Sequence, residues 1–340
     1  MRKAIMLLLM LVFMLVPSVT VADYTDGYDA PSATLAWRYT MLGERILTRR
    51  QVGLDIRGTV PYICSTFVGS EYINRHIDDE VVTSLVSEAR RLRARAVTFG
   101  IGGYHPTEDV ISVVIFADVA TTLPHTLVRS VNFCAHTGEI LTMNEAVGME
   151  IKPLAERILT EKIRSNPERY YAALNSEVPD AFYLTSERLV ILFDGFALST
   201  RVNTPDTLTL TLANIRTLVL TEREYRHNGP YGLKMIPIAT TARRLGFRVH
   251  WVQPEYDGND FVMITRGGSN IVMLTPGDNE YVIHGTQRRS LEAAPQLIFN
   301  RFVGENNTYV PITFFDHILP NTSYTIDWDG SITFLAYFED

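Results

Sequence analysis

The sequence predicts an α+β fold of two small domains, each an antiparallel sheet with packed helices. Two segments, 77–96 and 151–163, carry apolar residues three and four positions apart, which is the spacing of amphipathic helices. Shorter segments such as 110–119 and 207–212 are rich in β-branched or alternating apolar residues and indicate strands. The last third of the chain holds an internal repeat that combines a helix and a strand in each copy.

The repeat occupies residues 235–251 and 309–328. Each copy places a proline ahead of a short apolar helix, where proline suits the first turn, and ends a strand on tryptophan. In the first copy a glycine follows the helix and is suited to a left-handed cap. An Asp-Gly turn comes after both copies. The residues that define the motif are Pro237, Gly246, Trp251, Pro311 and Trp328.

This pattern resembles the copper amine oxidase N-terminal-like domain of bacterial envelope proteins, over roughly residues 234–334. The resemblance implies a small α+β accessory domain with neither copper nor oxidase chemistry. The second copy departs from the pattern, because Leu319-Pro320 stands where Leu-Gly is expected.

The N-terminus is typical of an exported protein. Arg2 and Lys3 precede the apolar run from Ala4 to Val16, and a Thr-Val-Ala site ends at Ala22. This layout predicts a signal peptide over residues 1–22 and an extracellular or cell-envelope location. The alternative is an uncleaved anchor, in which case the chain would also contact the membrane.

Length, charge and cysteine content limit the function further. Residues 23–32 are polar and predict a flexible leader, and the rest of the chain is long enough for domains at 33–220 and 234–340, with a charged linker at 221–233. The net charge of −7 argues against nucleic-acid binding. Only Cys64 and Cys134 are present, and they are either a disulfide or two small buried residues.

Within the first domain the elements follow one another in a clear order. Trp37 to Thr66 is extended or mixed, and the first helix follows, with Asp78 and Asp79 expected to cap its start. The strands 110–119 and 127–134 come next, then the second helix, and then the strands 189–193 and 207–212. The Gly-rich run 100–103 lacks the features of a phosphate loop and indicates a hinge or a bulge.

This order resembles the domain shared by lysozyme-sensing anti-sigma factors and some peptidoglycan deacetylases. The resemblance rests on an Asn-Phe pair before Thr137-Gly138-Glu139 and on the run LVILFDGFALS, which begins at Leu189. It implies two helices on an antiparallel sheet and direct binding of lysozyme. After Phe193, however, the residues Leu198 to Arg201 replace the Pro and Gly that the family carries, so no contact residue is transferred.

Arginines crowd the end of the first helix, at Arg90, Arg91, Arg93 and Arg95. The sequence favours a solvated helix end, since cations suit the negative end of the helix dipole. The alternative is a site for an anionic polymer or an acidic partner. A set of late aromatic residues has the same two interpretations, core packing or contacts with sugars and proteins: Tyr170, Tyr171, Phe182, Tyr183, Phe196 and Tyr225.

No catalytic, cofactor or metal site is predicted. The eight histidines form no HExxH motif and no zinc spacing, and no G-x-S-x-G motif is present. Adjacent carboxylates at 78–80 and at Glu108-Asp109 are more typical of caps than of glycosidase chemistry.

We therefore expect an exported, non-enzymatic binding protein of the cell envelope. Its partner would be a wall-associated one, either a lysozyme-like hydrolase or peptidoglycan itself. Two alternatives are a wall-modifying hydrolase that uses paired carboxylates and a purely structural envelope protein.

Overall fold

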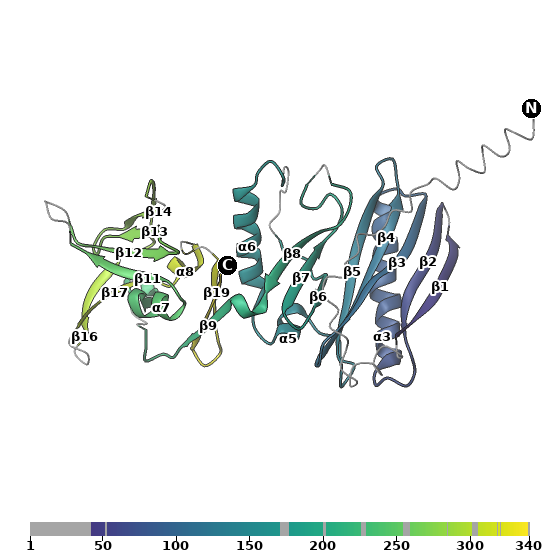
Figure 1. Cartoon of the computed structure of the whole chain (residues 1–340), viewed down its shortest axis with the longest axis horizontal. Coiled ribbons are helices and arrows are strands. Elements are labelled where there is room, and N and C mark those ends of the chain that lie inside the picture. The colour runs from purple at the N-terminus through teal and green to yellow at the C-terminus, as the bar shows by residue number, and fades with distance from the viewer. Residues whose placement is uncertain are drawn as a thin grey trace, which may run out of the picture. The chain divides into compact units, whose positions relative to one another are not determined.

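The computed structural model describes ten stretches of the chain, namely residues 42–51, 53–170, 177–199, 202–225, 229–253, 259–283, 285–300, 305–317, 319 and 321–338. The predicted signal peptide and leader, residues 1–22 and 23–32, lie outside the described residues. The described elements are small sheets with few helices, mostly antiparallel, which confirms the α+β class (Figure 1).

The first sheet has five strands in the order in which they occur in the chain. They are β1 (Leu42–Gln51), β2 (Leu54–Ile63), β3 (Ala96–Pro106), β4 (Val110–Ala120) and β5 (His125–Cys134). All neighbours are antiparallel except β2 and β3, which run parallel because a helix connects them.

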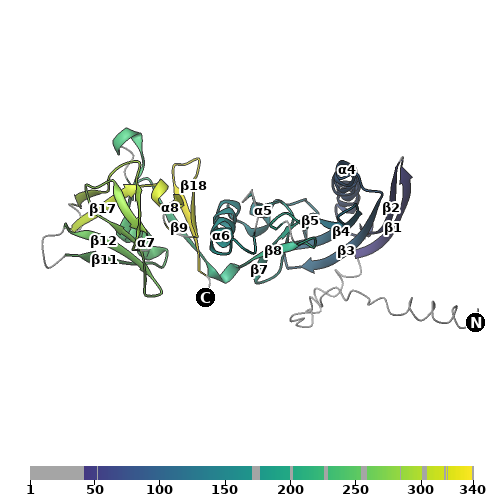
Figure 2. The same cartoon turned by 90° about the horizontal axis from the view of Figure 1, so that it is seen from above.

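That connection is one long helix over residues 70–91, built from α3 (Ser70–His76), a π-helical segment (Ile77–Val82) and α4 (Thr83–Arg91). It lies over one face of the sheet and buries the predicted apolar stripe from Ile77 to Ala89 (Figure 2). Because the helix begins seven residues before Ile77, at Ser70, the prediction that Asp78 and Asp79 cap its start is wrong. Asp78 instead forms an ion pair with Arg45 of β1.

The Gly-rich run of β3 forms a bulge, as the sequence predicts. The register with β4 shifts between Ile101 and Gly103. A Cβ atom on Gly102 would collide with the ring of Phe116, so only glycine leaves this ring its space. Just beyond the bulge, His105 stacks on Tyr183, with ring centroids 3.9 Å apart.

The second sheet and two helices follow. The elements are α5 (Met143–Val147), α6 (Lys152–Ser165), β6 (Phe182–Leu184), β7 (Arg188–Phe193) and β8 (Asp206–Thr211). The β6 backbone donates to hydroxyls of the first sheet, from Phe182 N to Ser130 Oγ at 2.8 Å and from Leu184 N to Ser112 Oγ at 3.1 Å. These bonds satisfy two backbone N–H groups of β6, which is an edge strand with a partner strand on one side only.

The C-terminal part contains three sheets, in the orders β10-β17-β16, β11 to β15, and β18-β19-β9. The remaining elements are β9 (Ile215–Leu220), β10 (Met235–Pro237), α7 (Ile238–Arg244), β11 (Arg248–Val252), β12 (Phe261–Arg266), β13 (Ser269–Leu274), β14 (Glu280–Ile283), β15 (Gln287–Ser290), β16 (Gln296–Asn300), β17 (Glu305–Pro311), α8 (Thr313–His317), β18 (Thr322–Ile326) and β19 (Ile332–Tyr337), with 3-10 turns at Leu212–Asn214 and Pro230–Gly232.

The sequence repeat becomes a symmetrical pairing in this part. Each copy is a strand, a helix and a second strand: β10-α7-β11 and β17-α8-β18. The two first strands pair antiparallel, with Ile236 opposite Val310 and Pro237 opposite Tyr309. Gly246 ends the first helix with φ of 98°, the left-handed cap that the sequence predicts.

Strand β9 joins the C-terminal sheet although it lies within the stretch assigned from sequence to the first domain. It pairs with β19 over its whole length, from Leu220 opposite Ile332 to Ile215 opposite Tyr337. In the predicted linker, Tyr225 is buried in the C-terminal core. Pairing across more than a hundred residues leaves no local sequence signal, so the pattern of β9 shows a strand but not its partner.

No helix among the described residues is both long enough and apolar enough to cross a membrane.

Candidate binding site

One end of the first sheet gathers residues from three separate stretches of chain. Strand β1 ends there and β2 begins, with Arg50 opposite Asp55. The Asp55 backbone N donates to Arg95 O at 3.0 Å, which places the start of β3 beside them. The long helix also ends here, and the Arg90 guanidinium donates to the Gln51 side chain of β1.

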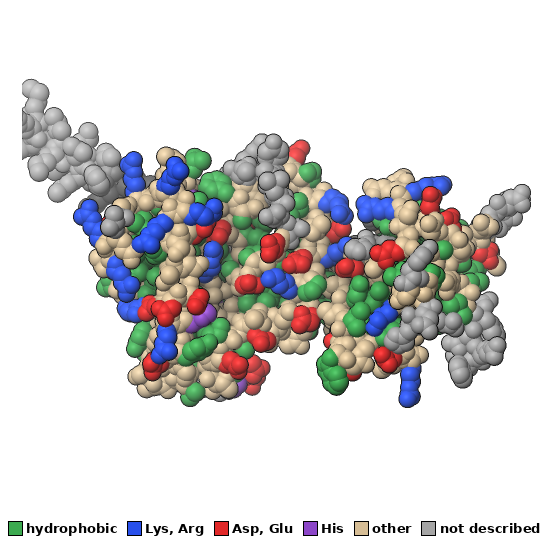
Figure 3. Space-filling view, turned by 180° about the vertical axis from the view of Figure 1, so that it is seen from behind, with side chains coloured by type: hydrophobic (Ala, Val, Ile, Leu, Met, Phe, Trp, Pro, Cys, Tyr) green, Lys and Arg blue, Asp and Glu red, His purple; other side chains and the backbone are tan. Residues whose placement is uncertain are grey.

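We call this region the arginine end, because its segments 49–57, 88–95 and 118–120 carry seven arginines against three carboxylates. All seven are exposed, and they are Arg49, Arg50, Arg57, Arg90, Arg91, Arg93 and Arg95. Figure 3 shows Lys and Arg side chains over this part of the surface. One carboxylate, Glu88, is already paired with Arg91, whose hydrogen bond lowers the pKa of Glu88. The region is therefore cationic on a chain whose net charge is −7.

The helix ends in a strained turn at this site. Arg93 has φ of 56°, the left-handed region that favours glycine. Its backbone N donates to Arg90 O, and Ala94 N donates to Ala89 O, both at 2.9 Å. This is the Schellman pattern with arginine at the position usually held by glycine, at a cost of about 1 kcal/mol.

A second strained residue lies at the same end of the sheet. Phe196 has φ of 65° and packs edge-on against His125, the first residue of β5. The loop that joins β4 to β5 lies at this end as well, and its Leu123 side chain is 70% exposed. Of the three described non-glycine residues with positive φ, two are therefore found here, and backbone strain of this kind concentrates at functional sites.

The sequence pointed to only part of this region. Arg90, Arg91, Arg93 and Arg95 are adjacent in the chain and visible as a cluster. Arg49, Arg50 and Arg57 come from a hairpin about forty residues earlier, and only the parallel pairing of β2 with β3 brings them to the same end. The double arginine at positions 49 and 50, inside a stretch predicted to be extended or mixed, was the one available signal.

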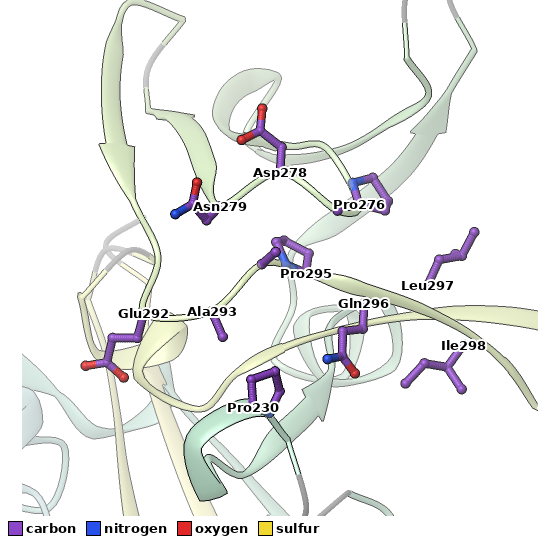
Figure 4. Close-up of a pocket in the computed structure, with 12 residues that line it drawn as sticks. Pro230, Pro276, Asp278, Asn279, Glu292, Ala293, Pro295, Gln296, Leu297 and Ile298 are labelled. Carbon is purple, nitrogen blue, oxygen red and sulfur yellow. The ribbon is translucent and has the colours of Figure 1, made fainter.

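A groove in the C-terminal part is a second candidate site, with a volume of about 890 Å³. Figure 4 shows its lining from three segments: the turn at Pro230, the turn at 276–279 and the run 292–298. Its only charged lining residues are Asp278 and Glu292, whose carboxylates point away from one another. The groove therefore lacks the facing carboxylates that the hydrolase alternative requires.

Two of the carboxylates named from the sequence are engaged elsewhere. Asp78 pairs with Arg45, and Asp109 accepts from the His136 ring at 3.3 Å. In the described stretches, no group of three or more His, Cys, Asp or Glu side chains could hold a metal ion.

Cys64 and Cys134 are not joined by a disulfide bond in the structure. A hydrogen bond with Thr137 lowers the pKa of the Cys134 thiol. Their pairing in an oxidising compartment stays a prediction.

Most of the late aromatic residues belong to the core. Tyr170, Phe182 and Tyr225 are buried, Tyr183 stacks on His105, and Tyr171 lies outside the described residues. By contrast, the two motif tryptophans are surface residues: Trp251 is 43% exposed and Trp328 is 99% exposed.

Comparison with known proteins places the C-terminal part in a recognisable class. Residues 230–334 match the family model of the copper amine oxidase N-terminal domain, which confirms the resemblance drawn from the repeat. No curated protein matches the chain.

Two solved structures are similar at low level. A DUF3298 family protein from Pseudomonas aeruginosa PAO1 has a TM-score of 0.35 and 7% identity, and a DUF3298 family member from Bacteroides fragilis NCTC 9343 has a TM-score of 0.32 and 11% identity. Each alignment covers 51% of this chain and 91% of the other. Likeness at this level carries no argument about function, and the predicted resemblance of residues 33–220 to the anti-sigma and deacetylase domain stays a prediction.

Proposed function

We propose that the chain is an exported, non-enzymatic binding protein of the bacterial cell envelope, and that its arginine end contacts an anionic component of the wall. The observation that carries the proposal is the assembly of seven exposed arginines from separate segments at one end of a sheet. Arginine binds carboxylates through two parallel hydrogen bonds, so a cluster of this kind suits the carboxylates of peptidoglycan peptides.

Peptidoglycan is favoured over a lysozyme-like hydrolase as the partner at this site. A cationic hydrolase would be repelled by the arginine end and would need an acidic surface elsewhere on the chain. An acidic hydrolase would be attracted to the same region. An acidic hydrolase would therefore compete with peptidoglycan for the arginine end, and a cationic hydrolase would not.

The test is co-sedimentation of the chain from residue 23 with purified peptidoglycan sacculi, with and without added lysozyme. The informative variant is Arg90→Gln, Arg93→Gln and Arg95→Gln combined. A matched control removes three exposed arginines from strands outside the arginine end, Arg188→Gln, Arg216→Gln and Arg248→Gln. Because both variants lose the same charge, only a local role of the arginine end predicts a difference between them.

We expect the control to pellet like the parent chain and the arginine-end variant to stay in the supernatant. Equal retention of the two variants, or no retention of the parent, would contradict the proposal. Pelleting only when lysozyme is present would move the partner to the enzyme. Soluble wall fragments released by the parent chain would favour the hydrolase alternative instead.

Export is the other half of the proposal. It is supported by the signal-like sequence of residues 1–22. Recovery of the chain in the cytoplasmic fraction of the producing cell, with Met1 to Ala22 attached, would contradict it.

A further inference from the structure

The motif tryptophans are not explained by the fold or by the arginine end. The sequence predicts that both copies of the repeat end a strand on Trp. Trp251 does lie in β11, but Trp328 lies in the turn that follows β18, and neither belongs to the C-terminal core. Trp328 is 99% exposed, which is unusual for a side chain that gains so much free energy from burial.

The turn that carries Trp328 is held tightly. We call residues 327–331 the Trp328 turn. It closes with two backbone hydrogen bonds, from Asp327 N to Ser331 O and from Gly330 N to Asp327 O, both at 2.9 Å. Asp329 Oδ1 accepts from Ser331 N at 2.9 Å and from Ser331 Oγ at 2.6 Å.

Contacts from neighbouring segments fix the turn further. Asp327 Oδ2 accepts from Thr333 Oγ1 at 2.9 Å, and Gly330 O accepts from Tyr225 OH at 2.6 Å. Lys234 Nζ donates to the same Tyr225 hydroxyl at 3.2 Å. The indole is thus presented on a rigid support, so little backbone entropy is lost when a ligand binds.

The chemistry around the indole is polar and partly anionic. Hydrogen bonds from Ser331 lower the pKa of Asp329, which keeps its carboxylate ionised. An exposed indole whose two neighbours in the sequence are aspartates is poorly suited to an anionic membrane. Its nearest exposed apolar neighbours in the strand register are Val219 and Ile326, a patch too small for a typical protein interface.

We propose that the Trp328 turn is a carbohydrate-binding site, which stacks the indole on a pyranose ring and accepts hydroxyl hydrogen bonds at the carboxylates of Asp327 and Asp329. A pyranose has an apolar C–H face and polar hydroxyls at its rim, which is the complement of an aromatic face flanked by acceptors. This site lies apart from the arginine end in the sequence and needs no charge on the ligand.

The test titrates the full exported chain with the β-1,4-linked hexamer of N-acetylglucosamine, followed by calorimetry and by tryptophan fluorescence. The variant is Trp328→Ala, which leaves the fold intact because the side chain is almost wholly exposed. Ile46→Ala, another exposed apolar residue and one outside the arginine end, is the control.

We expect binding heat and a blue shift of fluorescence for the parent chain and for the control. Trp328→Ala should bind about tenfold more weakly or worse, as expected when an aromatic side chain dominates a small contact. No binding by the parent at about 5 mM hexamer, where a Kd of 1 mM would already be near saturation, would overturn the proposal. Undiminished binding by Trp328→Ala would overturn it as well. If the indole instead contacts a protein partner, the parent chain will not bind the hexamer. Because the hexamer is uncharged, its binding does not depend on the arginine end, so the two proposals fail separately.

Discussion

The arginine end and the Trp328 turn are built in opposite ways. The arginine end joins segments that are about forty residues apart, and it holds Arg93 in a strained left-handed conformation. The Trp328 turn is five consecutive residues whose own side chains take part in four of its hydrogen bonds. The first is a surface of charge that depends on the pairing of whole strands, and the second is a local device placed on a hairpin.

This difference predicts different physical behaviour. A surface of exposed charges acts through long-range Coulomb attraction, which salt screens. A stacked indole acts through contact and loss of hydration, which salt affects little. The comparison can therefore be tested by conditions and substitutions that affect one region and spare the other.

The largest expected effect is that of salt. When salt rises from about 0.1 M to about 1 M the Debye length falls from about 10 Å to about 3 Å. Retention on sacculi through the arginine end should fall by about tenfold or more. Binding of the N-acetylglucosamine hexamer, measured in the same buffers, should change by less than about twofold. Parallel salt curves for the two ligands would show that the regions do not differ in this way.

Acidification should lower the stability of the fold through His105, which belongs to neither the arginine end nor the Trp328 turn. Burial lowers the pKa of His105 to about 4, so the folded state holds the neutral ring that stacks on Tyr183. In the unfolded chain the pKa of His105 has its ordinary value of about 6.5. The stability that comes from the neutral ring is therefore fully present above that pH and is lost as the pH falls toward 4. Between about pH 7.5 and about pH 5 the loss should be about 2 kcal/mol.

Urea unfolding at these two pH values measures this loss. His105→Phe keeps a ring at the position and removes the titration, so it should unfold with a weaker pH dependence. The same pH dependence in the variant and the parent would assign the effect to other groups.

Asp327→Ala and Trp328→Ala should differ in their effect on the stability of the Trp328 turn. It removes the acceptor for Thr333 Oγ1, so thermal unfolding should show a loss of about 1 kcal/mol together with weaker hexamer binding. Trp328→Ala should alter stability by less than about 0.5 kcal/mol, although it removes the stacking ring. An unstable Trp328→Ala variant would mean that the indole has a structural role.

The smallest effect is expected at Arg93. Arg93→Gly relieves the left-handed strain, so stability should rise by about 0.5 to 1 kcal/mol while retention on sacculi falls slightly. Arg95→Gly is the control, because Arg95 has no positive φ and should gain nothing. A loss of stability in Arg93→Gly would remove the argument that strain is kept there for binding.

Much of the architecture follows from local patterns. The strand β4 and the helix α6 lie close to their predicted limits, because apolar spacing marks both directly. The repeat also predicts its own elements: the helix α7, the cap at Gly246 and the strand β11. The start of the first helix was missed, since Ser70 to His76 carry few apolar residues and no side-chain cap.

Of the candidate sites, the sequence showed the arginines of 90–95 and the two motif tryptophans but not what surrounds them. Trp251 alternates with Val249 in a strand, and the same pattern is typical of a buried residue. Its exposure, and that of Trp328, depends on which faces the neighbouring sheets cover.

By itself, the sequence determined the α+β class, the repeat with the helix and the following strand of its first copy, and the signal-like start of the chain, because each is recorded in neighbouring residues. Only the tertiary structure decided that β9 completes a C-terminal sheet, that Arg49, Arg50 and Arg57 join the later arginines, and that Trp328 stands in solvent. These features depend on contacts between segments far apart in the chain, and such contacts leave no trace in local periodicity.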